Sequence, residues 1–382
     1  MRFKWFTAVA AAATCALVIG ACGGDDDTTT PQGQATQSAT QSATQTATQS
    51  SGTEANGALQ QYSQRPTSVG VTEAVGKPIP TGKKVAYITC AAPQCVTFGK
   101  ELTAAASVLG WTVKTFAPTG GDASATQAAF DQALATKPDA LTFSGISTAL
   151  IQRQLAAATK AGVAVFANSV QEKNVPGLLG STGAGEWYTK KMQTVGKVIG
   201  NTAPAGSNVI VSSIGGFAGQ DETFANIKTG MQESCPTCTM KEVLVSLTQI
   251  PEAPQILANA ARKDPKVKLI VSVLDSVMGK GMNTALKSAG VTGVQYAGAT
   301  GIEDGVQRVR AGQQVWVETY PIREFAWLNI DMMARHFAGV SITPDEVGGP
   351  EVWIVTKDNV PASNTFPVVE DYQAETKQLW GK

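Results

Sequence analysis

The sequence Lys84-Val85-Ala86-Tyr87-Ile88 is a short apolar run, and two similar runs follow it, Ala-Leu-Thr-Phe at 140–143 and Val-Ala-Val-Phe-Ala at 163–167. Runs of this length and composition are typical of buried β-strands. Amphipathic stretches that begin in turn residues separate them. Strands that alternate with helices in this way form a parallel sheet covered by helices, so the sequence predicts an α/β fold.

A second series of strands and helices begins after Gly183. About 300 residues lie from Lys83 onward, which is more than a single hydrophobic core usually supports. We therefore expect two doubly wound parallel-sheet lobes in series. The expected strands are 85–89, 112–116, 140–143, 163–167, 209–212, 239–245, 269–273, 295–299 and 315–319. The expected helices are 97–109, 124–135, 148–161, 186–199, 222–232, 253–262, 278–289, 302–310 and 327–337.

Residues 1–21 have the order of a secretion signal. Arg2 and Lys4 supply positive charge, residues 8–19 are apolar, and Ile-Gly-Ala-Cys22 is a small-residue cleavage site. The apolar stretch is too short for a spanning helix. The pattern resembles the lipobox of bacterial lipoproteins, which implies that Cys22 carries lipid and anchors the protein to the bacterial cell membrane, outside the cytoplasm. A plain signal peptide followed by an unrelated cysteine is the alternative.

The segment after Cys22 has almost no bulky apolar side chains up to Leu59, and 35–50 is four near-copies of Ala-Thr-Gln-Ser. Such a segment cannot bury enough surface to offset the entropy lost on ordering. We therefore interpret residues 22–82 as a disordered tether and an N-terminal arm.

The charges of the chain are balanced, with 30 basic and 30 acidic residues, and loss of the signal leaves 28 basic against 30 acidic. This balance provides no basic field for nucleic acid. No apolar run after Cys22 is long enough to cross a bilayer, so we expect the protein on a membrane and not within it.

Cysteine usage indicates an oxidising compartment. With the signal and the lipid site set aside, four cysteines remain, and close spacing favours the pairs Cys90–Cys95 and Cys235–Cys238 among three pairings. The sequence Cys235-Pro-Thr-Cys238 could also be a redox motif or half of a zinc site. However, it precedes a strand and not a helix start where a thiolate is activated, and the single histidine leaves few zinc ligands.

The order of the strand and helix segments carries a resemblance. In the first lobe these are Lys84-Val-Ala-Tyr-Ile, Leu109-Gly-Trp, Pro138-Asp-Ala-Leu-Thr-Phe and Ala161-Gly-Val-Ala-Val-Phe-Ala-Asn. In the second lobe they are Asp264-Pro-Lys-Val-Lys-Leu-Ile-Val-Ser-Val-Leu-Asp, Ala285-Leu-Lys-Ser-Ala-Gly, Gln307-Arg-Val-Arg-Ala-Gly and Thr319-Tyr-Pro. As an ordered set from Lys83 to Thr356, they resemble type I periplasmic binding proteins of the ribose and galactose group.

The resemblance implies a monomer whose two lobes close on a small solute that is handed to an ABC importer, with no enzymatic activity, cofactor or metal. It implies three chain crossings, near Ser181, Tyr320 and Pro350. The N-terminal lobe is then 83–181 plus 320–349, and the C-terminal lobe is 182–319 plus 350–382. The alternatives are a sensory lipoprotein that presents its closed form to a membrane receptor kinase, and, from another class, a secreted hydrolase.

The ligand positions depart from the pattern of sugar binders in the group. The first strand is followed by Ala91-Ala-Pro-Gln-Cys95 in place of an asparagine and paired aromatics. Asn168-Ser169 replaces the usual Asp-Arg, the sequence Phe224-Ala-Asn replaces the usual arginine, and Thr300 replaces an aspartate. These departures argue against a typical free pentose or hexose.

Residues just after strands are the expected ligand contacts, because ligands of doubly wound sheets lie beyond the carboxyl ends of the strands. We predict Gln94, Ser144 and Asn168 from the first lobe, and Phe217, Gln220, Asp275, Thr300 and Glu318 from the second. Asp275 is the strongest candidate, because it keeps the acidic character that the resemblance implies. A carboxylate there can accept two hydrogen bonds from a polyol or pair with an amine.

Three other patterns have weaker functional interpretations. Gly215-Gly-Phe-Ala-Gly-Gln220 could cradle a phosphate, but it lacks the glycine spacing and the following lysine of such loops. His336 is the only imidazole, so a catalytic triad would depend on this one residue, and we expect a packing role instead. Asp275 and Glu318 could act as an acid–base pair, but in this class of cleft carboxylates more often accept hydrogen bonds from the ligand.

Overall fold

The computed structural model describes residues 59–90, 92–119, 122–215, 219–342 and 348–382. The signal, the lipid-site prediction at Cys22, most of the tether and the ligand prediction at Phe217 lie outside the described residues. Within the described part of the chain, no helix has both the length and the apolar character needed to cross a membrane.

The first sheet contains five parallel strands in the order β2-β1-β3-β4-β5. These are β1 (Lys84–Ile88), β2 (Thr112–Phe116), β3 (Ala140–Ser144), β4 (Ala164–Asn168) and β5 (Leu178–Thr182). Strands β3 and β4 are buried along their whole length, because helices cover both faces of the sheet. The edge strand β5 was not expected from the sequence; its Leu-Leu-Gly-Ser-Thr run is only partly buried.

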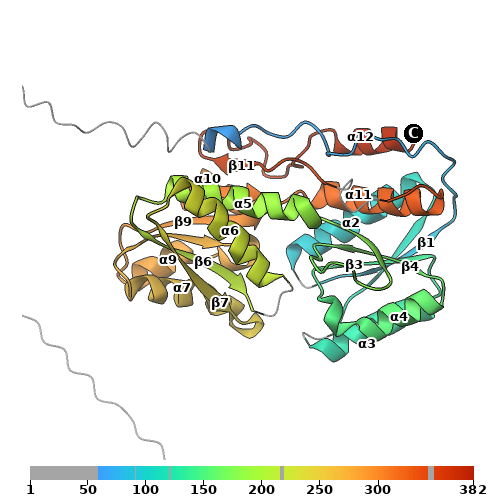
Figure 1. The fold of residues 1–382 in the computed structure, drawn as a ribbon, viewed down its shortest axis with the longest axis horizontal. Helices are drawn as coiled ribbons and strands as arrows, with labels where there is room; N and C mark the ends of the chain where they lie inside the picture. The colour runs from blue at the N-terminus through green and yellow to red at the C-terminus, as the bar shows by residue number, and fades with distance from the viewer. Residues whose placement is uncertain (1–58, 91, 120–121, 216–218, 343–347) are drawn as a thin grey trace, which may run out of the picture. The chain divides into compact units, whose positions relative to one another are not determined.

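Side chains alternate between the two faces of this sheet and fill two separate cores. On one face Tyr87 and Phe166 pack against α2 (Pro93–Val108) and α11 (Ile322–Phe337). On the other face Phe143 and Val165 pack against α3 (Ala123–Ala135) and α4 (Gln152–Lys160) (Figure 1). A short 3-10 turn, Thr148–Leu150, precedes α4.

The second sheet contains six strands in the order β11-β10-β9-β8-β6-β7, all parallel except β11. They are β6 (Asn208–Ile214), β7 (Thr239–Val245), β8 (Val267–Ser272), β9 (Gln295–Gly301), β10 (Trp316–Thr319) and β11 (Ile354–Thr356). The two parallel-dominated sheets confirm the predicted fold class.

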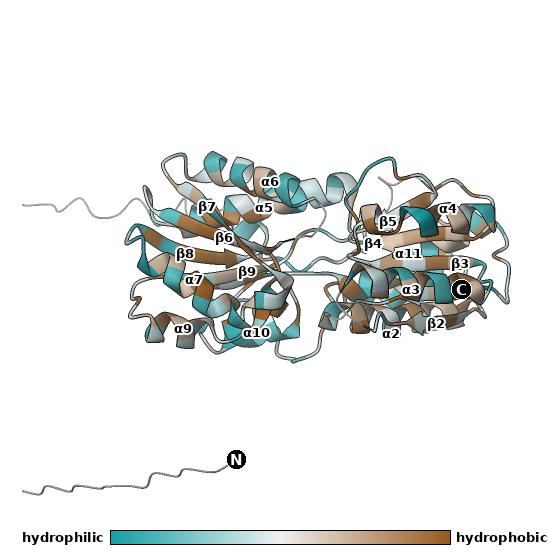
Figure 2. Ribbon diagram, turned by 90° about the horizontal axis from the view of Figure 1, so that it is seen from below, coloured by the Kyte–Doolittle hydropathy of each residue, from teal (hydrophilic) through white to brown (hydrophobic). Residues whose placement is uncertain are grey.

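Helices also cover both faces of the second sheet. One face packs against α5 (Gly185–Thr202) and α6 (Gln220–Ser234), and the other packs against α7 (Ala253–Arg262) and α9 (Met282–Ser288). α10 (Glu303–Arg310) packs on β10 and β11. Figure 2 shows strands that are mostly apolar and helices that mix hydrophilic and apolar residues, as expected where each helix has one buried and one exposed face.

Glycines allow α5 and α6 to pack very closely. A Cβ atom on Gly196 would lie 2.1 Å from the carbonyl oxygen of Ile227, and one on Gly230 would lie 1.9 Å from that of Gln193. Any larger residue at either position would push the two helices apart.

Three helices differ from the expected bounds for local reasons. α2 begins four residues early, because Pro93 occupies a first-turn position where its missing N–H costs nothing. The expected helix 278–289 is instead two helices, α8 (Asp275–Met278) and α9, with Gly281 between them at a φ of 91°. α11 begins directly after Pro321 and not at Trp327.

The chain passes between the lobes after β5, after β10 and before β11, near the three predicted crossings. β11 pairs with β10 in the second sheet, but α12 (Tyr372–Leu379) packs on α11 of the first lobe, which differs from the expected place of 350–382 in the second lobe. The reason is aromatic packing between segments far apart in the sequence. Trp380 stacks on Trp327 at 5.8 Å between ring centroids, and its indole donates a hydrogen bond to Asp331.

The described part of the N-terminal arm, residues 59–82, is packed against both lobes. Tyr62 packs on the core between the second sheet and helices α5 and α6. Its carbonyl oxygen accepts a hydrogen bond from Ile354 N at 2.8 Å. Val69 and Val75 are buried in the core between the first sheet and helices α2 and α11. The arm is therefore part of the folded unit in this segment, because its few apolar side chains pack into cores that the rest of the chain provides.

Candidate functional site

A cavity of about 320 Å³ lies between the carboxyl edges of the two sheets, at the small end of the range for ligand pockets. The first lobe contributes Cys90, Ala92, Pro93, Gln94, Cys95, Ser144, Gly145, Asn168, Ser169 and Gln171. The second lobe contributes Tyr188, Ser213, Ile214, Gln220, Thr223, Ile250, Val273, Leu274, Val277 and Thr300. Tyr320 and Ile322 come from the crossing between β10 and α11. Both lobes therefore enclose this space, which we call the cleft.

Gln94 reaches from the first lobe to the second across the cleft. It lies in the first turn of α2, beside the Cys90–Cys95 disulfide, and is 7% exposed. Its Nε2 atom donates to Ser276 Oγ and lies 3.4 Å from the carbonyl oxygen of Thr300. Its Oε1 atom is buried and has no protein partner. A buried acceptor without a partner is costly, so this position favours a ligand that can donate a hydrogen bond.

Ser144 and Asn168 end neighbouring strands of the first sheet, as the sequence predicted. The Tyr87 hydroxyl lies 3.2 Å from Ser144 Oγ, and burial raises the pKa of this phenol, so it remains a donor. Asn168 Oδ1 accepts a hydrogen bond from Thr182 Oγ1 at 3.0 Å, which leaves the amide nitrogen as the donor of this side chain.

Two residues of the cleft have a left-handed backbone. Ser169 has a φ of 58° and Thr300 has a φ of 53°, a region that residues other than glycine rarely adopt. Ser169 directly follows β4 and Thr300 is the second-last residue of β9. The Ser169 hydroxyl hydrogen-bonds to the Tyr320 hydroxyl. Backbone strain of this kind concentrates at ligand sites, where the surrounding structure holds it in place.

Tyr188 and Gln220 come from the first turns of α5 and α6. The Tyr188 hydroxyl lies 2.9 Å from Thr223 Oγ1, and burial raises its pKa to about 12, so it is neutral at physiological pH. Gln220 Nε2 donates to the carbonyl oxygen of Ile214 and lies 3.3 Å from Ser213 Oγ. These side chains give the second lobe neutral polar groups at the cleft.

Glu318 does not line the cleft, contrary to the sequence-based prediction. It is 1% exposed and forms an ion pair with the fully buried Lys191 at 3.1 Å. Glu318 also accepts a hydrogen bond from Thr300 N at 2.7 Å, and Lys191 donates to Thr300 Oγ1 at 3.0 Å. Burial raises the pKa of Glu318 and lowers that of Lys191, while each charge offsets part of the effect on the other. The ion pair therefore holds Thr300 in place by hydrogen bonds to its backbone nitrogen and its side-chain hydroxyl.

Asp275, the strongest candidate from the sequence, also lies outside the cleft wall. Its carboxylate is fully buried, pairs with Arg308 at 2.6 Å and accepts a hydrogen bond from the Tyr296 hydroxyl at 2.8 Å. It occupies space left by glycine, since a Cβ atom on Gly298 would lie 2.2 Å from Asp275 Oδ1. Its place differs from the predicted one because Arg308, 33 positions later in the sequence, holds the carboxylate inside the lobe.

Of the eight predicted ligand residues, five line the cleft, namely Gln94, Ser144, Asn168, Gln220 and Thr300. The sequence prediction missed Tyr188, Thr223, Ile250 and Val277, because it considered mainly residues at strand ends, and these lie on helices. The first helical turn after a crossing is a signal that could have identified Tyr188.

The second disulfide and His336 lie away from the cleft. The structure forms the second disulfide, Cys235–Cys238, between α6 and β7. Among the described residues, no group of three or more His, Cys, Asp or Glu side chains could hold a metal ion. His336 packs against the rings of Phe166 and Phe337, as expected for a packing role.

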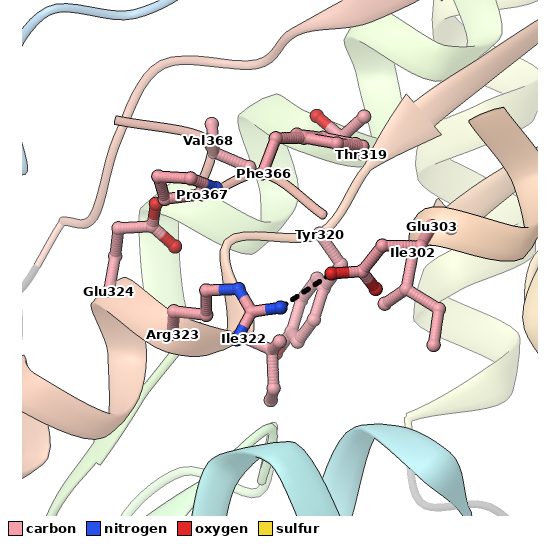
Figure 3. A pocket seen from close by; sticks show the side chains of 11 residues that line it. Ile302, Glu303, Thr319, Tyr320, Ile322, Arg323, Glu324, Phe366, Pro367 and Val368 are labelled. Carbon is pink, nitrogen blue, oxygen red and sulfur yellow. Dashed lines mark hydrogen bonds and ion pairs between the residues drawn. The ribbon is translucent and has the colours of Figure 1, made fainter. Parts of the chain in front are cut away.

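A second, much smaller cavity lies beside the crossing at Tyr320 (Figure 3). Its volume of about 10 Å³ leaves room for about one water molecule. Arg323 of α11 pairs there with Glu303 of α10. Because Arg323 also contacts Glu101 of α2 at 3.3 Å, it links the two lobes.

Residues 89–340 match the family described as periplasmic binding protein domain, which is more than half of the chain. The chain belongs to this family, and the resemblance inferred from the sequence is confirmed. The comparison with curated proteins gave no match.

Solved structures share the fold at low sequence identity. A periplasmic ribose ABC transporter protein from Conexibacter woesei has a TM-score of 0.61 and 19% identity, covering 75% of this chain and 95% of that one. A solute-binding protein from Mycobacterium smegmatis with bound glycerol has a TM-score of 0.61 and 21% identity, covering 74% and 99%. One from Agrobacterium vitis with bound allitol has a TM-score of 0.60 and 19% identity, covering 73% and 97%.

Proposed function

We propose that this protein is an extracytoplasmic solute-binding lipoprotein that captures a small polar molecule, sugar-like or related, and delivers it to an ABC importer. The observation that carries the proposal is the cleft, which is closed by side chains of both lobes at the carboxyl edges of two parallel sheets. A solute that contacts both walls binds the closed form better than the open form, so binding drives closure. The proposal is a binding function and not catalysis.

Gln94 and Asn168 provide the direct test. Once a solute has been found by thermal shift, calorimetry should show that Gln94→Ala and Asn168→Ala each weaken binding about tenfold, the loss expected for about 1.4 kcal/mol of hydrogen bonding. Gln255→Ala is the matched control, because Gln255 is exposed on α7 and outside the cleft. Folded Gln94 and Asn168 variants that bind like the control would place the solute elsewhere.

We propose that Cys22 carries the lipid anchor; the sequence Ile-Gly-Ala-Cys supports this. Fractionation of cells that express Cys22→Ser should move the protein from the membrane to the soluble extracytoplasmic fraction. Cys15→Ser, which changes a cysteine within the predicted signal, should leave the distribution unchanged. Membrane retention of the Cys22 variant would contradict the anchor.

A further inference from the structure

The cleft wall carries no formal charge in the part of the chain that the structure describes: no Asp, Glu, Lys, Arg or His side chain lines it. The nearest buried charges lie behind the wall and are already paired, Lys191 with Glu318 and Asp275 with Arg308. A charged solute would lose its hydration without gaining a counter-charge, and such desolvation costs several kcal/mol. The cleft is therefore suited to an uncharged solute.

The second lobe presents an apolar patch to the cleft, made of Ile250, Leu274 and Val277. These side chains are only partly buried; on one side they pack against the core of Ile214, Val245, Ala253 and Met278, and on the other they face the cleft. Covering this patch with apolar solute surface removes it from water and so favours binding. Hydroxyl groups placed against it would lose hydrogen bonds to water and find no partner there.

The polar groups of the cleft are neutral amides and hydroxyls, and both lobes contribute them. Gln94 Oε1 is buried without a protein partner, and the Gln94 side chain is itself more than nine-tenths buried. This oxygen needs a donor, which an uncharged solute can supply as an O–H or N–H group. Gln94 Oε1 and the apolar patch therefore select different faces of one molecule.

Resting on the proposed capture function, we propose that the solute is an uncharged amphipathic molecule. An O–H or N–H group of the solute meets Gln94 Oε1, and an aliphatic or aromatic face covers the Ile250–Leu274–Val277 patch. A charged solute and a polyol with hydroxyls on every face are both disfavoured, because the first lacks a counter-charge and the second leaves the patch against polar groups.

The test exposes ligand-free protein to an equimolar mixture of small metabolites, in which charged acids and amines, bare polyols and sugars, and neutral molecules with an apolar face are equally represented. Native mass spectrometry then identifies what is retained. Retention of neutral molecules with an apolar face supports the inference. Preferential retention of a charged molecule or a bare polyol overturns the inference while the capture function stands. Retention of nothing rejects the capture function and the inference with it.

Variants of the patch give a second readout. Val277→Thr replaces a methyl group by a hydroxyl at nearly constant shape, and Ile250→Thr replaces an ethyl group by a hydroxyl; both are expected to weaken binding of the retained solute three- to tenfold. Val96→Thr is the matched control, because Val96 is 67% exposed and lies outside the cleft. Equal binding by the two patch variants and the control, with melting temperatures unchanged, would show that the patch does not contact the solute and would overturn the inference.

Discussion

Asp275 and Glu318 are buried carboxylates whose partners come from distant parts of the chain. Each follows or ends a strand near the cleft, yet each turns away from it toward a cation, Arg308 or Lys191. A carboxylate with a buried counter-charge is more stable inside the lobe than an unpaired one on a cleft wall. At the scale of single residues, side-chain direction therefore depends on the available partner as well as on position in a strand.

Replacing Asp275 should separate folding from binding. Asp275→Asn leaves Arg308 without its counter-charge, and we expect the free energy of unfolding to fall by about 3 kcal/mol. Because the carboxylate lies outside the cleft wall, solute affinity should stay within about threefold of the parent. Chemical denaturation and calorimetry on the same preparation measure both quantities. A large loss of affinity at unchanged stability would restore Asp275 as a ligand residue.

Glu324 should make stability depend on pH. Burial raises its pKa from 4.5 to about 7, although its Oε1 accepts a hydrogen bond from Val369 N. Between these values the folded protein holds a proton that the unfolded chain has released, so this residue makes stability fall as pH rises, by about 3 kcal/mol in total. Its contribution is complete below pH 4.5 and lost above pH 7.

Glu324→Gln removes this titration, because the amide stays neutral at every pH. The difference in unfolding free energy between pH 5 and pH 8 should therefore be smaller in the variant than in the parent. Denaturant titrations at both pH values measure it, and Glu375→Gln, at a partly exposed carboxyl group of α12, is the control. Equal pH dependence in parent and Glu324→Gln would show that the carboxyl group titrates normally.

The arm at 59–82 is an element without regular structure along most of its length, and it is held by its partners. Arg65 pairs with Glu370, and Val75 N donates to the carbonyl oxygen of Leu379 at 2.8 Å. Trp111 Nε1 donates to the carbonyl oxygen of Pro80 at 2.7 Å. At the scale of elements, the arm and α12 together cover the side of α11 that faces away from the first sheet.

Truncation of one buried side chain tests whether the arm belongs to the folded unit. Val69 is fully buried, so Val69→Ala should lower the free energy of unfolding by about 2 kcal/mol through lost burial and a residual cavity. Thr72→Ala, at an exposed position of the same arm, should change it by less than about 0.5 kcal/mol. Two variants of equal stability would mean that the arm does not contribute to the core.

At the scale of the whole molecule, function depends on the balance between open and closed lobes. Gln94 meets Ser276 across the cleft, and Arg323 meets Glu303 beside the crossing at Tyr320 (Figure 3). These contacts favour the closed arrangement even before a solute adds its own. The fraction of closed protein scales the apparent affinity, so weakening a contact between the lobes should weaken binding.

Glu303→Gln removes one partner of an ion pair between the lobes, the pair that Glu303 forms with Arg323. Both side chains are about one-fifth exposed, so we expect a loss of about 1 kcal/mol and a three- to fivefold weaker solute affinity. Asp131→Asn is the control, since its pair with Arg153 lies within the first lobe. Calorimetry at low salt measures the effect, and identical affinities for the two variants would show that this pair does not couple to closure.

The sequence by itself determined the fold class, the order of most elements and the family, because strand and helix periodicity is a local property of the chain. It also predicted that Gln94, Ser144 and Asn168 lie at the cleft, because each follows a predicted strand and ligands lie beyond the carboxyl ends of parallel strands. The short edge strand β5 escaped prediction because its run is brief and only partly apolar.

Only the tertiary structure decided which polar groups face the solute and which support the lobes. Lys191 and Glu318 are far apart in sequence, and nothing local to either shows that they meet behind Thr300. The same holds for α12 on α11 and for Val69 in the first core. A buried charge is stable only beside a counter-charge or a hydrogen-bond partner, and an apolar side chain is buried only where other side chains form a core. The folded chain alone brings those partners together.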